Sequence, residues 1–338
     1  MKKKLAALAL TLILLRLMVL AGGAGPLLRC LTEETVPGRD EVPPSAETEP
    51  APSPIPKADA DAVPVPGDTE IQPQDADENQ TETADRPEVL PTTIKGGLTL
   101  RNSTDYTPDL ALLLTEGPSQ RLPEEGYQIL IVHTHGSEAY TPDGEDQYEV
   151  SDNYRTEDKA YSVIRVGDEL AAQWEAAGLR VLHDRNIYDY PSYTGSYTRS
   201  GEAVSACLAE HPEIAVVIDL HRDALGSGDT IYKTVAAVDG AASSQLMLLV
   251  GTDSSGLEHP AWQENLKLAL GLQAAVNIRY PTLARPVSLV RERYNQHLTT
   301  GSLILEVGSS GNTLQEALTA IRLFADATAP VLSALVGR

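Results

Sequence analysis

The sequence has little cysteine, few aromatic side chains and a shortage of basic ones, and each shortage excludes a class of protein. Cys30 and Cys207 are the two cysteines among 338 residues and form no CxxC pair, which excludes a disulfide framework and a cysteine-rich metal site. Aromatic residues make up 5% of the chain, with a single Phe, so a core must consist mainly of aliphatic side chains. With 26 basic against 48 acidic residues, the net charge of −22 argues against binding to nucleic acids.

Residues 1–30 differ from the rest of the chain in charge and apolar content. Three lysines precede a leucine-rich run from Leu5 to Leu28, which Arg16 and a stretch of small residues interrupt. The small residues favour a cleaved export signal, and the length of the run favours a membrane anchor. We expect a single-pass anchor in the cell membrane. The lysines would then stay in the cytoplasm and the remainder of the chain would lie outside it.

Residues 31–91 are rich in proline and acidic side chains and contain almost no large apolar ones. Such a segment cannot bury enough surface to offset the entropy lost on ordering, so we expect a disordered, extended linker. Residues 92–338 then form one folded domain.

This last region alternates short apolar runs with amphipathic segments. The apolar runs predict strands at 129–132, 179–182, 214–220, 232–238, 246–250, 287–290 and 302–307. The amphipathic segments predict helices at 157–177, 197–210, 260–278 and 313–328. The alternation predicts an α/β fold, a single sandwich domain in which helices flank a mostly parallel or mixed sheet.

Three of the predicted strands end in polar residues that a core would not require. His135 and Glu138 follow the first strand, His221 lies at the end of another, and ligands in α/β sheets bind at the carboxyl ends of strands. Two imidazoles and a carboxylate, with a fourth position open to water, are the ligand set of a catalytic zinc site. His133 is the alternative to His135 as the first ligand.

Glu306 is a lone carboxylate within the apolar strand Leu-Ile-Leu-Glu-Val. A charge buried in a strand is costly unless it is paired or functional. Because a zinc-bound water needs a proton acceptor beside it, we expect Glu306 to be the general base.

Four segments carry a resemblance to a known family: residues 133–140, 189–197, 217–224 and 305–308. In that order they resemble stage II sporulation protein P, a family related to the zinc-dependent N-acetylmuramoyl-L-alanine amidases. The resemblance covers about residues 98–338 and implies an amidase-like fold with Zn²⁺ as cofactor. It implies a peptidoglycan hydrolase that cuts the lactyl–peptide amide, and cross-linking peptides as well, during engulfment in endospore formers. Stage II sporulation proteins D and M are the implied partners.

The resemblance also assigns roles to single residues. His135 matches the first zinc histidine, His221 the second, and Glu306 the catalytic glutamate. The amidase relatives place their glutamate ligand at the start of the helix after the first strand, but the residues around Glu157 do not match that register. We therefore expect Glu138 as the third ligand, with Glu157 as the fallback.

Three residues near the predicted ligands could contact the substrate. Arg222 and Arg199 could each pair with a stem-peptide carboxylate, and Tyr193 could form part of a sugar- or peptide-binding lip. Arg222 could instead pair with a neighbouring Asp, and the tyrosines could simply pack within a loop.

The rival functions are a zinc carboxypeptidase, which the HxxE spacing favours, and a wall-binding module that has lost its metal.

Overall fold

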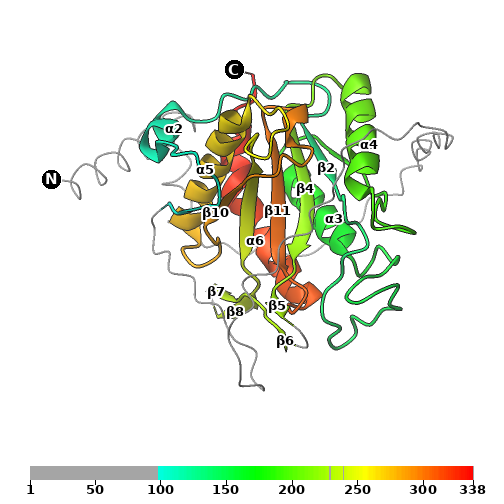
Figure 1. Ribbon diagram of the computed structural model, residues 1–338. Helices are drawn as coiled ribbons and strands as arrows, with labels where there is room; N and C mark the ends of the chain where they lie inside the picture. The colour runs from blue at the N-terminus through cyan, green and yellow to red at the C-terminus, as the bar shows by residue number, and fades with distance from the viewer. Residues whose placement is uncertain (1–97, 228–229, 239, 338) are drawn as a thin grey trace, which may run out of the picture.

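The computed structural model describes residues 98–337, apart from residues 228–229 and 239 (Figure 1). The expected anchor (1–30) and linker (31–91) lie outside the described residues. Within the described part, no helix combines the length and apolar character needed to cross a bilayer.

Seven strands form one mixed sheet with the order β1-β10-β9-β11-β4-β2-β3. Their bounds in that order are β1 (Leu100–Asn102), β10 (Val287–Val290), β9 (Leu246–Gly251), β11 (Ser302–Ser309), β4 (Val216–Asp223), β2 (Ile129–Val132) and β3 (Val181–His183). Neighbours run parallel except β9 and β11, which are antiparallel. Strands β11, β4, β2 and β3 therefore end at the same edge of the sheet, near the bottom of Figure 1.

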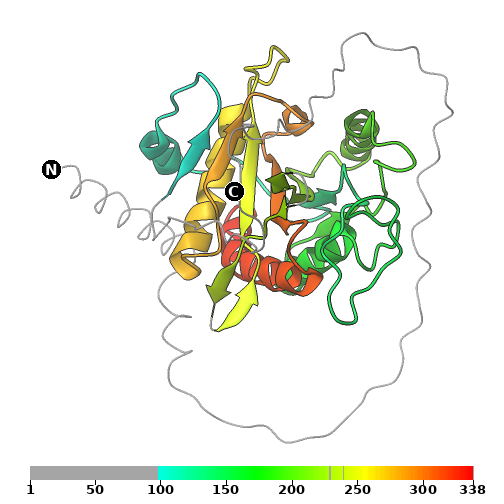
Figure 2. The same cartoon turned by 60° about the horizontal axis from the view of Figure 1, so that its bottom comes forward.

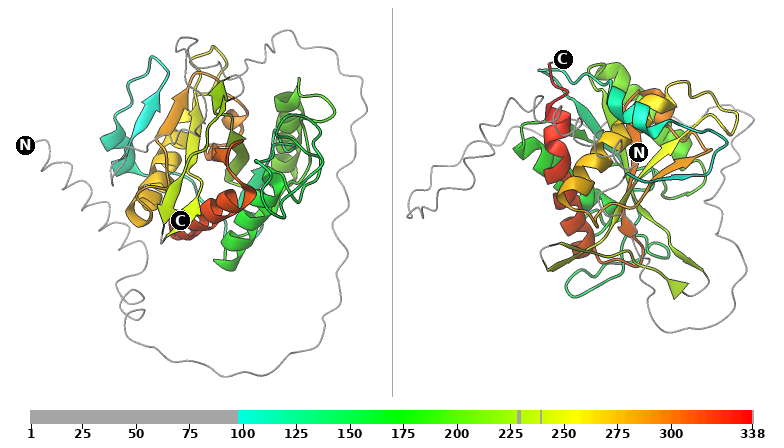
Figure 3. Two further views of the ribbon diagram at one scale, coloured as in Figure 1. Left: turned by 90° about the horizontal axis from the view of Figure 1, so that it is seen from below. Right: turned by 90° about the vertical axis from the view of Figure 1, so that its left-hand side faces the viewer.

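Helices cover both faces of the sheet. Helices α3 (Val163–Ala176), α5 (Trp262–Arg279) and α6 (Leu314–Ser333) lie on one face, and α4 (Ser196–Glu210) lies on the other (Figures 2 and 3). The smaller elements are α2 (Leu110–Glu116), the 3-10 helix η2 (Gln296–Leu298), and two hairpins, β5 (Gly226–Ser227) with β6 (Thr230–Ile231) and β7 (Ala236–Val238) with β8 (Ala241–Ser243). This arrangement confirms the expected α/β sandwich with a mixed sheet.

Strand β2 shows why a short, continuously apolar segment suits the middle of this sheet. Ile129 and Ile131 join the large core beneath α3, α5 and α6, whereas Leu130 and Val132 join a smaller cluster beneath α4. Because both faces of the strand are covered, every side chain must be apolar. On β4 the same alternation places Asp219 and His221 on the α4 face, where the site lies.

Some helices and strands differ from those predicted from the sequence, because helix capping and pairing with distant strands set their bounds. Helix α3 begins at Val163 and not at residue 157, because the Ser162 side chain accepts a hydrogen bond from the Ile164 amide and caps the helix there. The strand expected at 232–238 is shortened to β7, and β1 and α2 were not expected at all.

Candidate functional site

The carboxyl ends of β2, β4 and β11 bring four of the predicted residues together. The Glu138 amide donates a hydrogen bond to the His135 carbonyl, 3.0 Å away, so both residues lie on one turn after β2. The ring centroids of His135 and His221 lie 5.3 Å apart with the planes at 83°. Glu306 is the register partner of His221 across the β11–β4 pair, so both side chains point to the same face. The structure thus places His135, Glu138, His221 and Glu306 in one site.

Glu138 is buried between two guanidinium groups. Its Oε1 lies 3.6 Å from a terminal nitrogen of Arg155 and 3.6 Å from one of Arg222. Its Oε2 accepts a hydrogen bond from the Arg222 amide and lies 3.5 Å from His221 Nδ1. Burial alone would raise the pKa of Glu138, but Arg222 and His221 outweigh it and hold the pKa below its ordinary value. The carboxylate is therefore ionised.

A further carboxylate lies beside one ring nitrogen of each imidazole. His221 Nε2 lies 2.8 Å from Asp219 Oδ1, and His135 Nδ1 lies 3.8 Å from Asp189 Oδ2. Neither contact is a hydrogen bond: the contact between His221 and Asp219 is short but poorly aligned, and the one between His135 and Asp189 is too long. Both ring nitrogens are therefore buried without a hydrogen-bond partner. Metal-ligating histidines usually have a carboxylate in this place, which orients the ring.

Without a metal, the two rings differ in charge. Burial lowers the pKa of His135 to about 3, so this imidazole is neutral. Burial also opposes the charge on His221, but Asp219 and Glu138 raise its pKa well above the ordinary value. Among the described residues, no three His, Cys, Asp or Glu side chains have their donor atoms arranged as they stand to hold a metal ion.

Glu306 is a carboxyl group in an unusual environment. Its Oε2 is buried and has no hydrogen-bond partner, although the residue as a whole is only half-buried. Burial and the neighbouring Asp223 raise the pKa of Glu306 to about 8, while His221 lowers it in part. A carboxyl group with a pKa near neutral can both take and return a proton at physiological pH.

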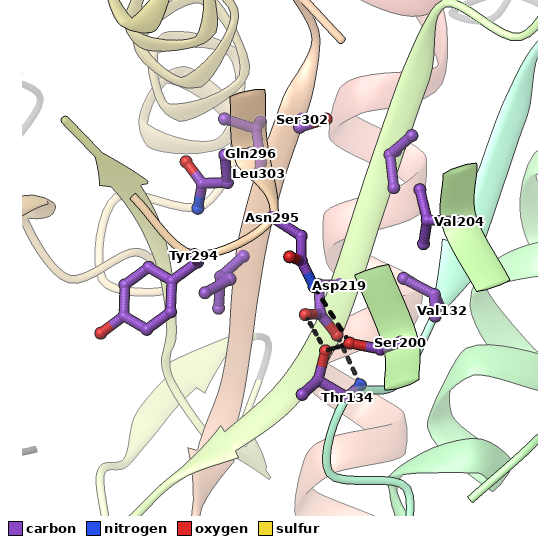
Figure 4. Close-up of a pocket in the computed structure, with 12 residues that line it drawn as sticks. Val132, Thr134, Ser200, Val204, Asp219, Tyr294, Asn295, Gln296, Ser302 and Leu303 are labelled. Atoms are coloured by element: carbon purple, nitrogen blue, oxygen red, sulfur yellow. Dashed lines mark hydrogen bonds between the residues drawn. The ribbon is translucent and has the colours of Figure 1, made fainter. Parts of the chain in front are cut away.

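A small cavity of about 20 Å³ lies on the α4 face behind the site (Figure 4). Asp219 reaches its wall and accepts hydrogen bonds from the amide and the hydroxyl of Thr134, and that hydroxyl also contacts Ser200. The cavity has room for about one water molecule, so it belongs to the support of Asp219 and is too small for a substrate.

The three residues expected to contact substrate lie in different surroundings. The Arg222 side chain is 5% exposed, and its nitrogens donate to the carbonyls of Ala139 and Tyr154, so it supports Glu138 from behind. Arg199 donates to the carbonyls of Tyr188, Ser192 and Thr194 and fixes the loop before α4. Tyr193 lies at the site itself, with its ring stacked on His135 at 4.6 Å and 11°.

The two alternative metal ligands, Glu157 and His133, lie away from the site or have other partners. Glu157 is exposed and interacts with the Tyr190 hydroxyl, away from the imidazoles. His133 uses both ring nitrogens elsewhere, with Nδ1 2.8 Å from the Leu220 carbonyl and Nε2 2.8 Å from His183 Nε2. The structure therefore brings His135 and Glu138 to His221 and leaves these two residues out.

Sequence reasoning assigned no role at the site to Arg155, Asp189 or Tyr294. Arg155 contacts Glu138 and Asp189, and its guanidinium carbon lies 5.0 Å from the centre of the Tyr193 ring. Tyr294 adopts a left-handed backbone with φ of 50° and packs its ring 5.2 Å from that of Tyr197. Asp189 lies in one of the four segments that carry the resemblance. Nothing in the local sequence marks Arg155 or Tyr294.

Comparison with known proteins identifies related chains. The family model of stage II sporulation protein P (SpoIIP) matches residues 38–329. Stage II sporulation protein P of Bacillus subtilis (strain 168) is 28% identical over an alignment of 211 residues that covers 59% of this chain and 49% of that protein. The match thus spans about half the length of that relative.

Two solved structures are similar to parts of this chain. The CwlD amidase from Clostridioides difficile, solved in complex with the GerS lipoprotein, is 13% identical, with 62% of this chain and 98% of that one covered and a TM-score of 0.38. The N-acetylmuramoyl-L-alanine amidase AmiC2 of Nostoc punctiforme is 12% identical, with 62% and 97% covered and a TM-score of 0.35. These TM-scores are too low to support a conclusion about this chain.

Proposed function

The chain belongs to the stage II sporulation protein P family, and from this membership we propose that it is a zinc-dependent N-acetylmuramoyl-L-alanine amidase. Its substrate would be peptidoglycan, cut at the amide that joins the lactyl group of N-acetylmuramic acid to the stem peptide. We place this activity in engulfment during endospore formation, outside the cytoplasm, with residues 1–30 as a single-pass membrane anchor. Cleavage of cross-linking peptides and action beside stage II sporulation proteins D and M belong to the same proposal.

The donor set fits a zinc ion, which the family implies. His135, His221 and Glu138 supply two imidazoles and an ionised carboxylate at one edge of the sheet, with His221 Nδ1 3.5 Å from Glu138 Oε2. Asp219 lies beside His221 Nε2 and Asp189 near His135 Nδ1, and a carboxylate beside one ring nitrogen is common for metal-ligating histidines. When bound, zinc would polarise the scissile carbonyl and lower the pKa of the attacking water.

The remaining chemistry would come from the chain itself. Glu306 would take the proton of the attacking water and return it to the leaving amine nitrogen, a role for which its buried Oε2, without a hydrogen-bond partner, is available. Arg155 and Arg222 would keep Glu138 ionised and in position. The observation that carries the proposal is the convergence of His135, Glu138, His221 and Glu306 at one edge of the sheet.

The test is to incubate the purified full chain in detergent with purified sacculi, with a chelator and without one, and to identify the released fragments. The amidase predicts stem peptides with a free L-alanine amino terminus, lost with the chelator and restored by zinc. Loss of only C-terminal amino acids would indicate a carboxypeptidase instead. Binding without release in either condition would leave a wall-binding module.

A further inference from the structure

One arginine beside the candidate site keeps hydrogen-bond donors to spare. Arg285 Nη1 donates a hydrogen bond of 2.6 Å to Asp223 Oδ2, and among the described residues its guanidinium has no other hydrogen bond or ion pair. Because a guanidinium carries several N–H donors, most of them remain for a ligand. Arg155, Arg199 and Arg222 differ in this respect, since each contacts two or more groups of the protein. The Arg285 side chain is 15% exposed, so solvent and ligands can reach it.

The backbone of Arg285 is fixed just before β10, at the edge of the sheet where the site lies. Leu246 at the start of β9 forms a parallel bridge with Ala284, and the Arg285 amide donates to the Leu246 carbonyl at 2.8 Å. The Arg285 carbonyl accepts a hydrogen bond from the Gln273 side chain of α5. A side chain on a backbone held from both sides is positioned more precisely than one on an open loop.

Strand order places this arginine on one side of Glu306 and the metal-ligating histidines on the other. Glu306 is the register partner of His221 on β4 and of Met247 on β9. Arg285 lies beyond β9, and its side chain reaches back to Asp223 at the end of β4. Besides burial, Asp223 raises the pKa of Glu306 and Arg285 lowers it, so both charges act on this carboxyl group.

The proposed reaction supplies a partner for the remaining donors of Arg285. If Glu306 returns a proton to the leaving amine, the stem peptide lies on the Glu306 side of the scissile amide, away from the histidines. The lactyl carboxyl group is itself part of that amide, so every carboxylate close to it belongs to the stem peptide. The nearest is the α-carboxylate of the second residue, D-glutamate, because the peptide continues through its γ-carboxyl group.

We propose that Arg285 determines substrate specificity by binding this α-carboxylate of the stem peptide. The planar fork of a guanidinium matches a carboxylate, and Asp223 holds the fork in place from its other side. The identity of the bound group rests on the proposed function, whereas the contact between Arg285 and Asp223 does not.

The test compares two N-acetylmuramoyl tripeptides that differ only in the second residue, which is D-glutamate with a free α-carboxylate or D-isoglutamine, in which this group is an amide. The purified full chain with zinc should cleave the free acid with a kcat/KM roughly tenfold higher, as expected of a hydrogen bond between charged groups. Arg285→Gln should lose this preference because only the acid reacts more slowly, and Arg285→Lys should keep part of it. The matched control is Arg291→Gln at the other end of β10, which also removes a pair with one aspartate and should leave the preference unchanged.

Asp223→Asn distinguishes substrate binding from an ion pair that only supports the fold. This variant breaks the same contact but keeps the cation, so the preference for the acid should remain. A purely structural pair predicts instead that Asp223→Asn and Arg285→Gln slow the cleavage of both tripeptides equally. That result, the absence of a preference in the unmodified chain, or an unchanged preference in Arg285→Gln would each overturn the inference.

Release of stem peptides from sacculi decides separately whether the proposed function stands. If the unmodified chain cleaves neither tripeptide, their dissociation constants, measured with a chelator present, decide the role of Arg285. Tighter binding of the acid that Arg285→Gln abolishes would support this role, and equal constants for the two tripeptides would refute it.

Discussion

Alanine in place of Gly167 should destabilise the protein, although alanine normally favours a helix. Gly167 lies within α3, and an added Cβ would meet His133 Nε2 at 2.6 Å and His183 Nε2 at 2.7 Å. Neither ring can retreat easily, because His133 is fully buried and both of its ring nitrogens are engaged. The added methyl group must therefore separate the rings or push α3 away from the sheet.

The size of the effect follows from three contributions. Helix propensity favours alanine over glycine by about 1 kcal/mol. Overpacking a core costs about 1–3 kcal/mol, and a buried polar group that loses its hydrogen bond costs about 1–3 kcal/mol more. Middle values leave a net loss of about 3 kcal/mol in the free energy of unfolding. For a domain of this size the melting temperature should fall by about 6–12 °C.

Urea unfolding of the full chain, followed by circular dichroism and tryptophan fluorescence, measures this loss. Trp174 is a suitable probe because it is fully buried and lies in α3 itself. The matched control is Gly271→Ala in α5, where a Cβ would meet only the Pro118 ring, at 3.2 Å, and stability should be unchanged or slightly higher. If Gly167→Ala is as stable as the unmodified protein, then α3 is not packed against the two rings as described.

Three further predictions concern the site and the helices around it. Glu306→Ala should retain zinc yet lose about 100-fold or more in turnover of sacculi, whereas His221→Ala should lose the metal; equal zinc content and activity in both would refute their roles. Arg222→Ala should lower kcat with KM nearly unchanged, because this side chain supports Glu138; a large rise in KM alone would indicate substrate contact instead. A hydrogen bond from Arg322 lowers the pKa of Glu169 to about 2, so this link between α3 and α6 should stabilise the fold above about pH 4.5 and fade as the pH falls towards 2. Urea unfolding over this pH range should show the difference between the unmodified protein and Glu169→Gln shrinking as the pH falls, and a constant difference would contradict it.

Segments with both faces buried were predictable from the sequence alone. The runs at 129–132 and 287–290 coincide with β2 and β10, because a continuous apolar stretch of that length has few other places in a sandwich. Strand β1 has no such run. It forms because it pairs with β10, almost 190 residues later in the chain, and no local pattern reveals a pairing of that range.

At the site, the residue types were predictable and their surroundings were not. Buried imidazoles and a carboxylate in an apolar strand are unusual enough to mark His135, His221 and Glu306. Arg222 was expected to face substrate because an arginine beside a predicted ligand suggests recognition of an anion. Its contact with Glu138 depends on a loop 84 residues earlier in the chain, which only the folded structure brings near.

The reversal of direction between β11 and β9 determines on which side of the sheet the segment between β4 and β9 lies. Strand β4 ends and β9 begins at the edge where the candidate site lies, so the 22 residues between them leave and re-enter the sheet on the same side, carrying both hairpins. This excursion never crosses the sheet. Its buried part is fastened to the end of β11, where Ser309 and Asn312 donate hydrogen bonds to the carbonyls of Tyr232 and Thr234, so a change in its fold would alter the rim next to the reacting groups.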